Sequence, residues 1–160
     1  MISVVLVTRD SAAVLAQTLA ALVPAAVDGL VKEVIVVDAG STDPTLEIAD
    51  DAGARIITLD GDNGTRLAAG CAAARGAWIL AVAPNLVLPE AWRGPVEAHL
   101  GQGGGGSVWL GEPGWWKRLT GAPLGVLARR TDYDRVGGFT AGGRSVATLI
   151  RSLKARRLAG

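Results

Sequence analysis

Two patterns of apolar and polar residues, one typical of strands and one typical of helices, alternate along the first ninety positions of the chain. Continuous apolar, β-branched runs, typical of strands covered on both faces, predict strands over 2–7, 34–37, 55–59 and 78–82. Between them, apolar residues return every three or four positions and predict helices from Ser11 to Pro24, from Pro44 to Gly53 and over 63–76. This alternation with short connections predicts an α/β fold, a three-layer sandwich with a mostly parallel central sheet and helices on both faces.

The pattern is less regular in the second half. It predicts a helix over 91–100, strands over 107–110 and 123–128, and loops over 101–106 and 114–118. Asp132 and Asp134 are expected to cap a short helix. The last segment, 146–158, alternates aliphatic residues with arginine and lysine and predicts an amphipathic basic helix.

Composition narrows the class of protein. The chain has 160 residues, of which 49% are hydrophobic and 19% charged, which predicts one globular domain over 1–160. A net charge of +1 argues against a dedicated nucleic-acid binder. Cys71 is the only cysteine, so we expect a small buried thiol and no cysteine metal cluster. Without a basic leader or an uninterrupted apolar span, we expect a cytoplasmic protein.

The segment 34–45 carries the most chemistry. Asp38 closes a buried strand and is followed by Gly40, Ser41 and Asp43, where the next helix begins. Ligands of parallel α/β sheets bind outside the carboxyl ends of the strands, and a carboxylate there can accept a hydrogen bond from a base N–H. Ser41 and Asp43 fit two interpretations, an anion site at the helix start or simple helix caps.

Five segments, in the same order along about 140 residues, resemble the family 2 glycosyltransferases of the GT-A fold. That family moves a sugar from a nucleotide-sugar donor. The segments are Ile2–Thr8, Val36–Thr45, Gly70–Gly76, Leu88–Trp92 and Arg129–Phe139. The second is similar to the family's VVDGGSTDGT, and the third and fourth are similar to its NxGxxxAxG and LPxxW motifs. The resemblance implies a nucleotide-binding half over 1–90 and a shortened acceptor-side half over 91–160.

The resemblance also implies a set of nucleotide-binding residues for a UDP- or GDP-type donor. Asp38 takes the family's nucleotide-recognising position, and Arg66 lies near its basic position. Arg66 fits either a diphosphate contact or an ordinary solvent-facing helix arginine. The implied set is Thr8, Arg9, Asp38, Gly40, Ser41, Asp43, Arg66 and Asn85.

At two functional positions of the family, the metal-binding aspartate and the general base, this chain differs from the family's pattern. Mg²⁺ or Mn²⁺ is expected for the family, but Asn85 stands at the position of its metal-binding aspartate and brings no charge. The family's general base follows Gly-Gly-Phe, yet no Asp or Glu occurs after Asp134. The sequence thus predicts no catalytic residue and no metal ligand. It favours a nucleotide-sugar binding domain, with a divergent metal-independent transferase and a non-catalytic scaffold as alternatives.

A second kind of surface is indicated near the C-terminal end of the sequence. Aromatic and basic residues adjoin at Trp115, Trp116, Lys117 and Arg118, and the predicted basic helix follows them. Such residues suit an anionic membrane surface or a protein partner, so a location at the inner membrane surface is one interpretation. Packing of the two tryptophans over the acceptor side of the sheet is the other.

Overall fold

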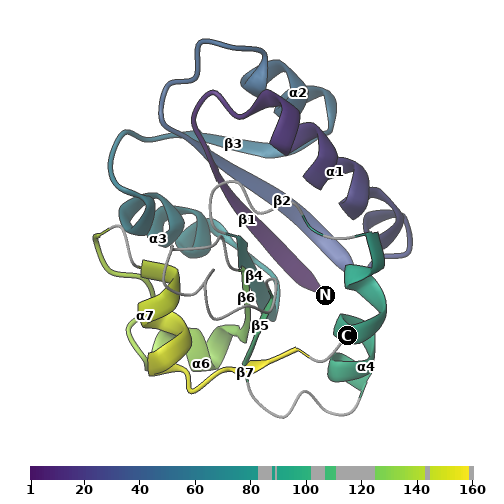
Figure 1. Cartoon of the computed structure of the whole chain (residues 1–160), viewed down its shortest axis with the longest axis vertical. Coiled ribbons are helices and arrows are strands. Elements are labelled where there is room, and N and C mark those ends of the chain that lie inside the picture. Colours follow the sequence, from purple (N-terminus) through teal and green to yellow (C-terminus); the bar gives the residue numbers. More distant parts are fainter. Residues whose placement is uncertain (83–87, 89, 102–106, 111–124, 143–144, 159–160) are drawn as a thin grey trace, which may run out of the picture.

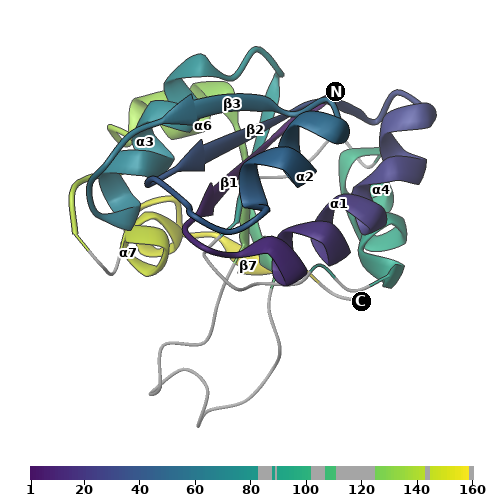
Figure 2. The ribbon, with the colours of Figure 1, turned by 90° about the horizontal axis from the view of Figure 1, so that it is seen from above.

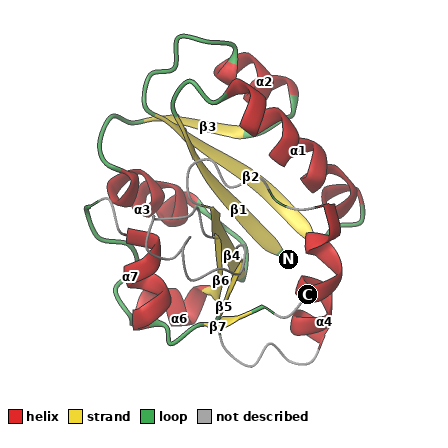
Figure 3. Ribbon diagram, viewed as in Figure 1, coloured by secondary structure: helices red, strands yellow, loops and turns green. Residues whose placement is uncertain are grey.

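A single sheet with helices on both faces organises the computed structural model (Figures 1 and 3). The structure describes residues 1–82, 88, 90–101, 107–110, 125–142 and 145–158. Asn85, the glycine loop over 102–106 and the segment 115–118 lie outside these residues. The strands of the described part are β1 Ile2–Thr8, β2 Val31–Asp38, β3 Arg55–Thr58, β4 Trp78–Val82, β5 Val108–Leu110, β6 Gly125–Arg129 and β7 Arg156–Arg157.

The order of the strands is β3-β2-β1-β4-β6-β5-β7. The first four are parallel, and β6 runs antiparallel to both β4 and β5. The predicted α/β fold with a mostly parallel sheet is confirmed. The strand order reverses between β1 and β4, so this sheet has a switch point beside the carboxyl end of β1, where such sheets bind ligands.

Helices cover the sheet in two groups (Figures 1 and 2). One face carries α1, α2 and α4, and the other carries α3, α6 and α7. Buried aliphatic side chains of the strands alternate between the two cores, as the period of two requires. The helices of the described part are α1 Ala12–Val27, α2 Thr45–Asp51, α3 Asn63–Ala73, the 3₁₀ turn η1 Glu90–Trp92, α4 Arg93–Gly101, α6 Arg130–Arg135 and α7 Ser145–Ser152.

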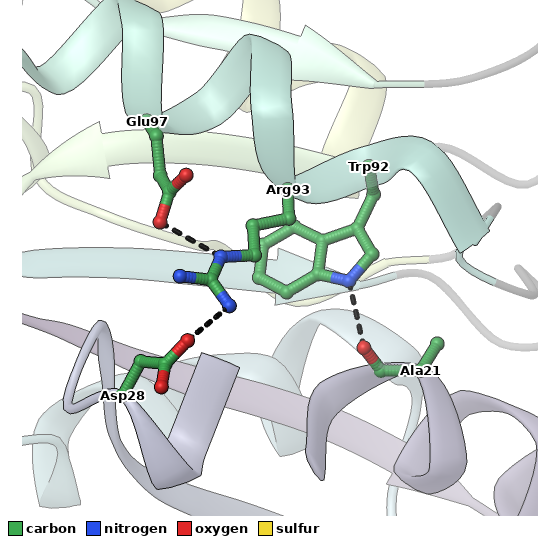
Figure 4. A network of polar contacts seen from close by, with 5 residues as sticks. All are labelled: Ala21, Asp28, Trp92, Arg93 and Glu97. Atoms are coloured by element: carbon green, nitrogen blue, oxygen red, sulfur yellow. Dashed lines mark hydrogen bonds and ion pairs between the residues drawn. The ribbon is translucent and has the colours of Figure 1, made fainter. Parts of the chain in front are cut away.

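The first helix continues one turn beyond the expected stop at Pro24. Leu22 and Ala25 are buried against the sheet, and this packing outweighs the missing N–H of the proline. The indole of Trp92, which is almost fully buried, donates from Nε1 to the carbonyl oxygen of Ala21 at 2.9 Å (Figure 4). The expectation that Pro24 ends the helix was therefore wrong.

The third helix ends at Ala73, before the glycine that was expected to stop it. Arg130 instead donates to the carbonyl oxygens of Cys71 and Ala74 at the helix end. Gly76 does not end the helix but avoids a clash, since a Cβ there would lie 2.7 Å from the backbone nitrogen of Ser3. The glycine permits a close approach to β1.

The basic segment at the end of the sequence is only partly helical. After α7 the chain turns at Lys154, which has a φ of 51°, and enters the short strand β7. Arg156 donates its backbone N–H to the carbonyl oxygen of Ser107 at 3.1 Å, so pairing with β5 replaces the last helical turns. The prediction of one basic helix over 146–158 was wrong beyond Ser152. Among the described helices, none has both the length and the apolar character needed to cross a bilayer.

Candidate functional site

The carboxyl ends of β1, β2 and β3 bring the candidate residues together. In the parallel register Thr8 stands opposite Asp38, and Asp38 stands opposite Thr58. The backbone N–H of Leu59 donates to the carbonyl oxygen of Asp38 at 2.9 Å, which continues the ladder past the strand end. Each of the three strands ends in a polar residue, so hydrogen-bonding side chains lie side by side at this edge of the sheet.

Asp38 is completely buried and accepts four hydrogen bonds. Oδ1 accepts from the hydroxyls of Thr8 at 2.7 Å and Ser41 at 2.6 Å. Oδ2 accepts from the backbone N–H groups of Gly40 at 2.9 Å and Ser41 at 2.7 Å. A carboxylate offers about four acceptor positions. All of them are used within the protein.

The electrostatics of Asp38 follow from these contacts. Burial raises the pKa of its carboxyl, but the hydrogen bonds from Ser41, Thr8 and Gly40 outweigh burial, and the pKa is lowered. The residue is therefore a charged, fully satisfied anchor for the loop that follows β2. A ligand N–H could reach it only by displacing one of its four donors.

A second carboxylate, Asp10, locks the loops after β1 and β2 together. Asp10 adopts a φ of 45°, which is unusual for a residue with a side chain. Its backbone N–H donates to Oγ of Ser41 at 2.8 Å, and its Oδ1 accepts from the backbone N–H groups of Thr42 at 2.7 Å and Asp43 at 3.3 Å. A continuous network thus runs from the backbone N–H of Asp10 through the hydroxyl of Ser41 to the carboxylate of Asp38.

Asp43 and Thr45 complete this lock. Oδ2 of Asp43 accepts from the first N–H of α1, on Ala12, at 3.1 Å, while Oδ1 accepts from both the N–H and the hydroxyl of Thr45. The hydroxyl oxygen of Thr45 accepts from the N–H of Ser11 at 2.9 Å. For Asp43 the geometry favours capping, because its carboxylate accepts from the first N–H groups of both α1 and α2. Ser41 instead bonds Asp10 and Asp38 and caps neither helix.

Arg66 reaches the same edge from α3. Its side chain is 7% exposed, so the interpretation as a solvent-facing arginine was wrong. Nη1 donates to the carbonyl oxygen of Thr8 at 2.7 Å, and Nη2 donates to Oδ1 of Asn63 at 2.6 Å. Nε is buried and is one of two described side-chain atoms, with Oγ of Ser107, that are buried without a hydrogen-bond partner.

The glycine one turn after Arg66 explains how the guanidinium gets there. A Cβ on Gly70 would lie 2.4 Å from Cγ1 of Val5 and 3.0 Å from Cγ2 of Val37. The helix therefore lies unusually close to β1 and β2 at this turn. Residues four apart share a helix face. The close approach thus carries Arg66 over the end of β1.

Around this buried framework lie exposed residues of the loops. Arg9 directly follows β1, Gly40 and Thr42 lie in the loop after β2, and Asp60 follows β3. Asp60 was not among the expected site residues, although an acid two positions past a predicted strand is a signal that the sequence offers. The arrangement offers a ligand exposed groups of both charges mounted on rigid strand ends.

The part of the chain that the structure describes holds no cluster of metal-ligating side chains. No group of three or more His, Cys, Asp or Glu residues that could hold an ion occurs there. Cys71 is buried, as expected, and burial raises the pKa of its thiol to about 12. Asn85, at the family's metal position, lies outside the described residues.

Two acidic side chains of α6 form ion pairs with arginines. Asp132 pairs with Arg135 at 2.7 Å, and Asp134 lies 3.6 Å from Nε of Arg130. The backbone N–H of Gly142, followed by that of Thr65, lowers the pKa of Asp62, which caps α3. The segment after Phe139 is thereby tied to the start of the helix that carries Arg66.

Comparisons with known proteins agree with this architecture. The model of glycosyl transferase family 2 matches residues 3–109. Among solved structures, glucosyl-3-phosphoglycerate synthase from Mycobacterium tuberculosis in complex with Mn²⁺ and UDP-glucose aligns with a TM-score of 0.72 and 22% identity, over 99% of this chain and 69% of that chain. Its complex with Mn²⁺, UDP and glucosyl-3-phosphoglycerate gives 0.67 and 20%, over 99% and 70%.

A further mycobacterial protein aligns with a TM-score of 0.70 and 23% identity, over 99% of this chain and 65% of that chain. The comparison with curated proteins gave no match. At these identities the solved structures establish the shared fold, and the family match covers more than half of the chain.

Proposed function

Since this chain belongs to glycosyltransferase family 2, we propose that the carboxyl edge of β1, β2 and β3 binds the nucleotide of a nucleotide-sugar donor. The Thr8–Asp38–Ser41 network is the observation that carries the proposal. A buried carboxylate costs solvation energy and adds little to packing. Its use at the edge where parallel sheets bind ligands is best explained by the need to hold two loops in a binding shape.

Direct contacts with the nucleotide fall to the groups that remain accessible. Arg9 is exposed, directly follows β1 and supplies a mobile positive charge for the diphosphate. Gly40 is exposed in the next loop and lets a ribose or phosphate approach the backbone closely. Arg66 adds a buried positive charge beneath them. Thr8, Asp38, Ser41 and Asp43 act by holding these loops.

Solved relatives supply the chemical class of the ligand. The synthase from M. tuberculosis was solved with UDP, with UDP-glucose and with Mn²⁺. A UDP-type donor is therefore the first candidate for this chain, with a GDP-type donor as the comparison. The binding proposal needs no cation, because Asn85 stands at the metal position and no described cluster replaces it.

We further propose that binding rather than sugar transfer is the main activity. An inverting transfer needs a carboxylate to remove the proton of the acceptor hydroxyl. The sequence contains no Asp or Glu after Asp134, and the two described acids of α6 are engaged with arginines. An active enzyme would have to take its base from another part of the chain.

Thermal unfolding with UDP or GDP, each with and without Mn²⁺, tests the binding proposal. A ligand at one hundred times its Kd stabilises the folded state by about 2.7 kcal/mol, which gives a clear rise in Tm. We expect UDP to raise the Tm without Mn²⁺, and Arg9→Ala to reduce the rise. Lys32→Ala is the matched control, because Lys32 is an exposed cation near the amino end of β2. No shift with either nucleotide at millimolar concentration would refute the proposal.

Hydrolysis of UDP-glucose by the purified protein tests the second part. We expect no release of UDP above the rate without protein, with or without Mn²⁺ and Mg²⁺. Turnover that depends on protein concentration would instead identify a divergent transferase. The binding measurement and the hydrolysis measurement are independent, so one proposal can fail without the other.

A further inference from the structure

The outer face of α1 is apolar, although it is exposed to water. Helix α1 lies between α2 and α4 on one face of the sheet (Figures 1 and 2). It carries no charged side chain over its 16 residues, and one of its two polar side chains, Thr18, is buried. Among the described residues three large apolar side chains are exposed, and two of them, Val23 at 56% and Val27 at 80%, belong to this helix. A surface helix normally turns charged and polar residues outward, so this face has the character of an interaction surface.

The exposed residues of α1 follow the spacing of a seam between two helices. Five exposed side chains recur at alternating steps of three and four residues, and together they form the α1 seam: Ala13, Ala16, Ala20, Val23 and Val27. This spacing keeps one narrow stripe of a helix facing a second helix, as in coiled coils. The small alanine side chains let the axes of two helices come close together. The α1 seam therefore has the pattern of a surface that pairs with another helix.

The order of side-chain sizes along the α1 seam indicates which helix it pairs with. Alanines occupy its amino-terminal part and the two larger valines occupy its carboxyl-terminal part. Two antiparallel copies of α1 with their seams in register place Val27 of each copy opposite Ala16 of the other, and Val23 opposite Ala20. Each large side chain then faces a small one, and the two helix dipoles are opposed. The α1 seam is thus complementary to itself, as the interface of a two-fold dimer must be.

The charges around α1 argue against other partners. Helices that lie on anionic membranes carry lysine or arginine on their polar face, and α1 carries neither. A charged protein partner would find no ion pair on the α1 seam. Asp28, which follows the helix, is paired with Arg93 at 2.5 Å. The partner that fits this surface is a second uncharged helix, and another copy of the chain supplies one.

From these observations we propose that the protein forms a two-fold dimer in which the α1 seam packs antiparallel on the α1 seam of a second copy. One pair of helices makes a small interface, so we expect a dissociation constant in the micromolar range. The α1 seam contains none of the residues of the proposed nucleotide edge. The dimer therefore does not depend on nucleotide binding.

Sedimentation equilibrium of the whole chain, from micromolar to near-millimolar concentration, tests the dimer. We expect the wild type to associate and Ala20→Glu to weaken association by roughly tenfold or more, because the carboxylate would be buried against Val23 of the other copy. Ala20 is exposed in a single copy, so the fold itself should tolerate the charge. Ala26→Glu is the matched control, since Ala26 is exposed on α1 but lies beside the seam, and it should associate like the wild type.

A charge exchange tests the antiparallel register. Val23→Lys on its own should weaken association as well. An equimolar mixture of Ala20→Glu and Val23→Lys should associate more tightly than either variant alone, because position 20 of one copy faces position 23 of the other. Circular dichroism checks that each variant is folded, and Ala16→Lys with Val27→Glu makes the same exchange at the next pair of positions.

Four results would overturn the dimer. They are a wild type that stays monomeric over the whole concentration range, undiminished association in Ala20→Glu, an equal loss of association in Ala26→Glu, and a mixture of the two charged variants that associates no better than its components.

Discussion

The close approach of α3 to the sheet yields the sharpest stability prediction, at Gly70. A Cβ added there would lie 2.4 Å from Cγ1 of Val5 and 3.0 Å from Cγ2 of Val37, and both valines are completely buried. Overpacking of this kind costs about 1 to 3 kcal/mol. Replacing a helical glycine with alanine contributes about 1 kcal/mol in the opposite direction. Because a contact of 2.4 Å is far inside the van der Waals distance, the overpacking cost falls in the upper part of that range, about 2 to 3 kcal/mol. We therefore expect Gly70→Ala to lower the free energy of unfolding by about 1 to 2 kcal/mol.

A double-mutant cycle identifies the clash as the cause. Val5→Ala removes the nearest methyl groups and should by itself cost about 2 kcal/mol through lost burial and a cavity. In that background Gly70→Ala should cost at least about 1 kcal/mol less than it does in the wild type. Urea titrations followed by circular dichroism give all four free energies of unfolding.

Gly94 provides the control for the cycle. It lies in α4, and a Cβ there would meet no atom within 4 Å. Gly94→Ala should leave the protein as stable as the wild type or slightly more stable. A Gly70→Ala protein that is as stable as the wild type, or costs in the cycle that simply add, would refute the packing account. The same helix turn carries Arg66, so a real shift of α3 should also weaken nucleotide binding.

Three further outcomes follow from particular contacts. Asp38→Asn should lower the free energy of unfolding at pH 7 by about 2 to 3 kcal/mol. Hydrogen bonds outweigh burial and lower the pKa of Asp38 in the folded state below 3.8. Urea titrations should therefore show the stability difference between wild type and variant shrinking as the pH falls through that lowered pKa. Trp92→Phe, which removes the hydrogen bond from the indole to Ala21, should clearly lower the urea midpoint. Arg93→Ala removes solvent-exposed ion pairs with Asp28 and Glu97 (Figure 4) and should change the midpoint little. A larger effect of Arg93→Ala than of Trp92→Phe would contradict this explanation. Cys71, whose thiol pKa burial raises to about 12, should react with a thiol reagent at pH 8 only after unfolding, and rapid reaction of the folded protein would contradict its burial.

Much of the first half of the fold can be predicted from the sequence, because the local and the global signals agree there. The apolar run before Asp38 is a strand buried on both faces, and it is one in the structure. Errors arise where tertiary contacts override local rules. Helix α1 passes Pro24 because its next turn packs on the sheet, and the chain leaves α7 for β7 because β5 offers an edge to pair with.

The candidate site was predictable in location but not in detail. That Asp38 lies at the sheet edge follows from its place at the end of a strand. Its saturation does not, because the donors come from Thr8, thirty residues earlier, and from a turn whose N–H directions depend on backbone angles. The burial of Arg66 likewise depends on how closely α3 approaches β1. Gly70 permits this close approach, but no local sequence pattern predicts it.

Hydrogen exchange in the presence of saturating UDP tests the central claim most directly, because it locates the nucleotide. We expect slower exchange in the segments 9–12, 39–43 and 59–66, which surround the carboxyl ends of β1, β2 and β3, and unchanged exchange in 28–33 and 74–78 at the opposite edge. Protection confined to the opposite edge, or no protection in any segment at a saturating concentration, would contradict the account.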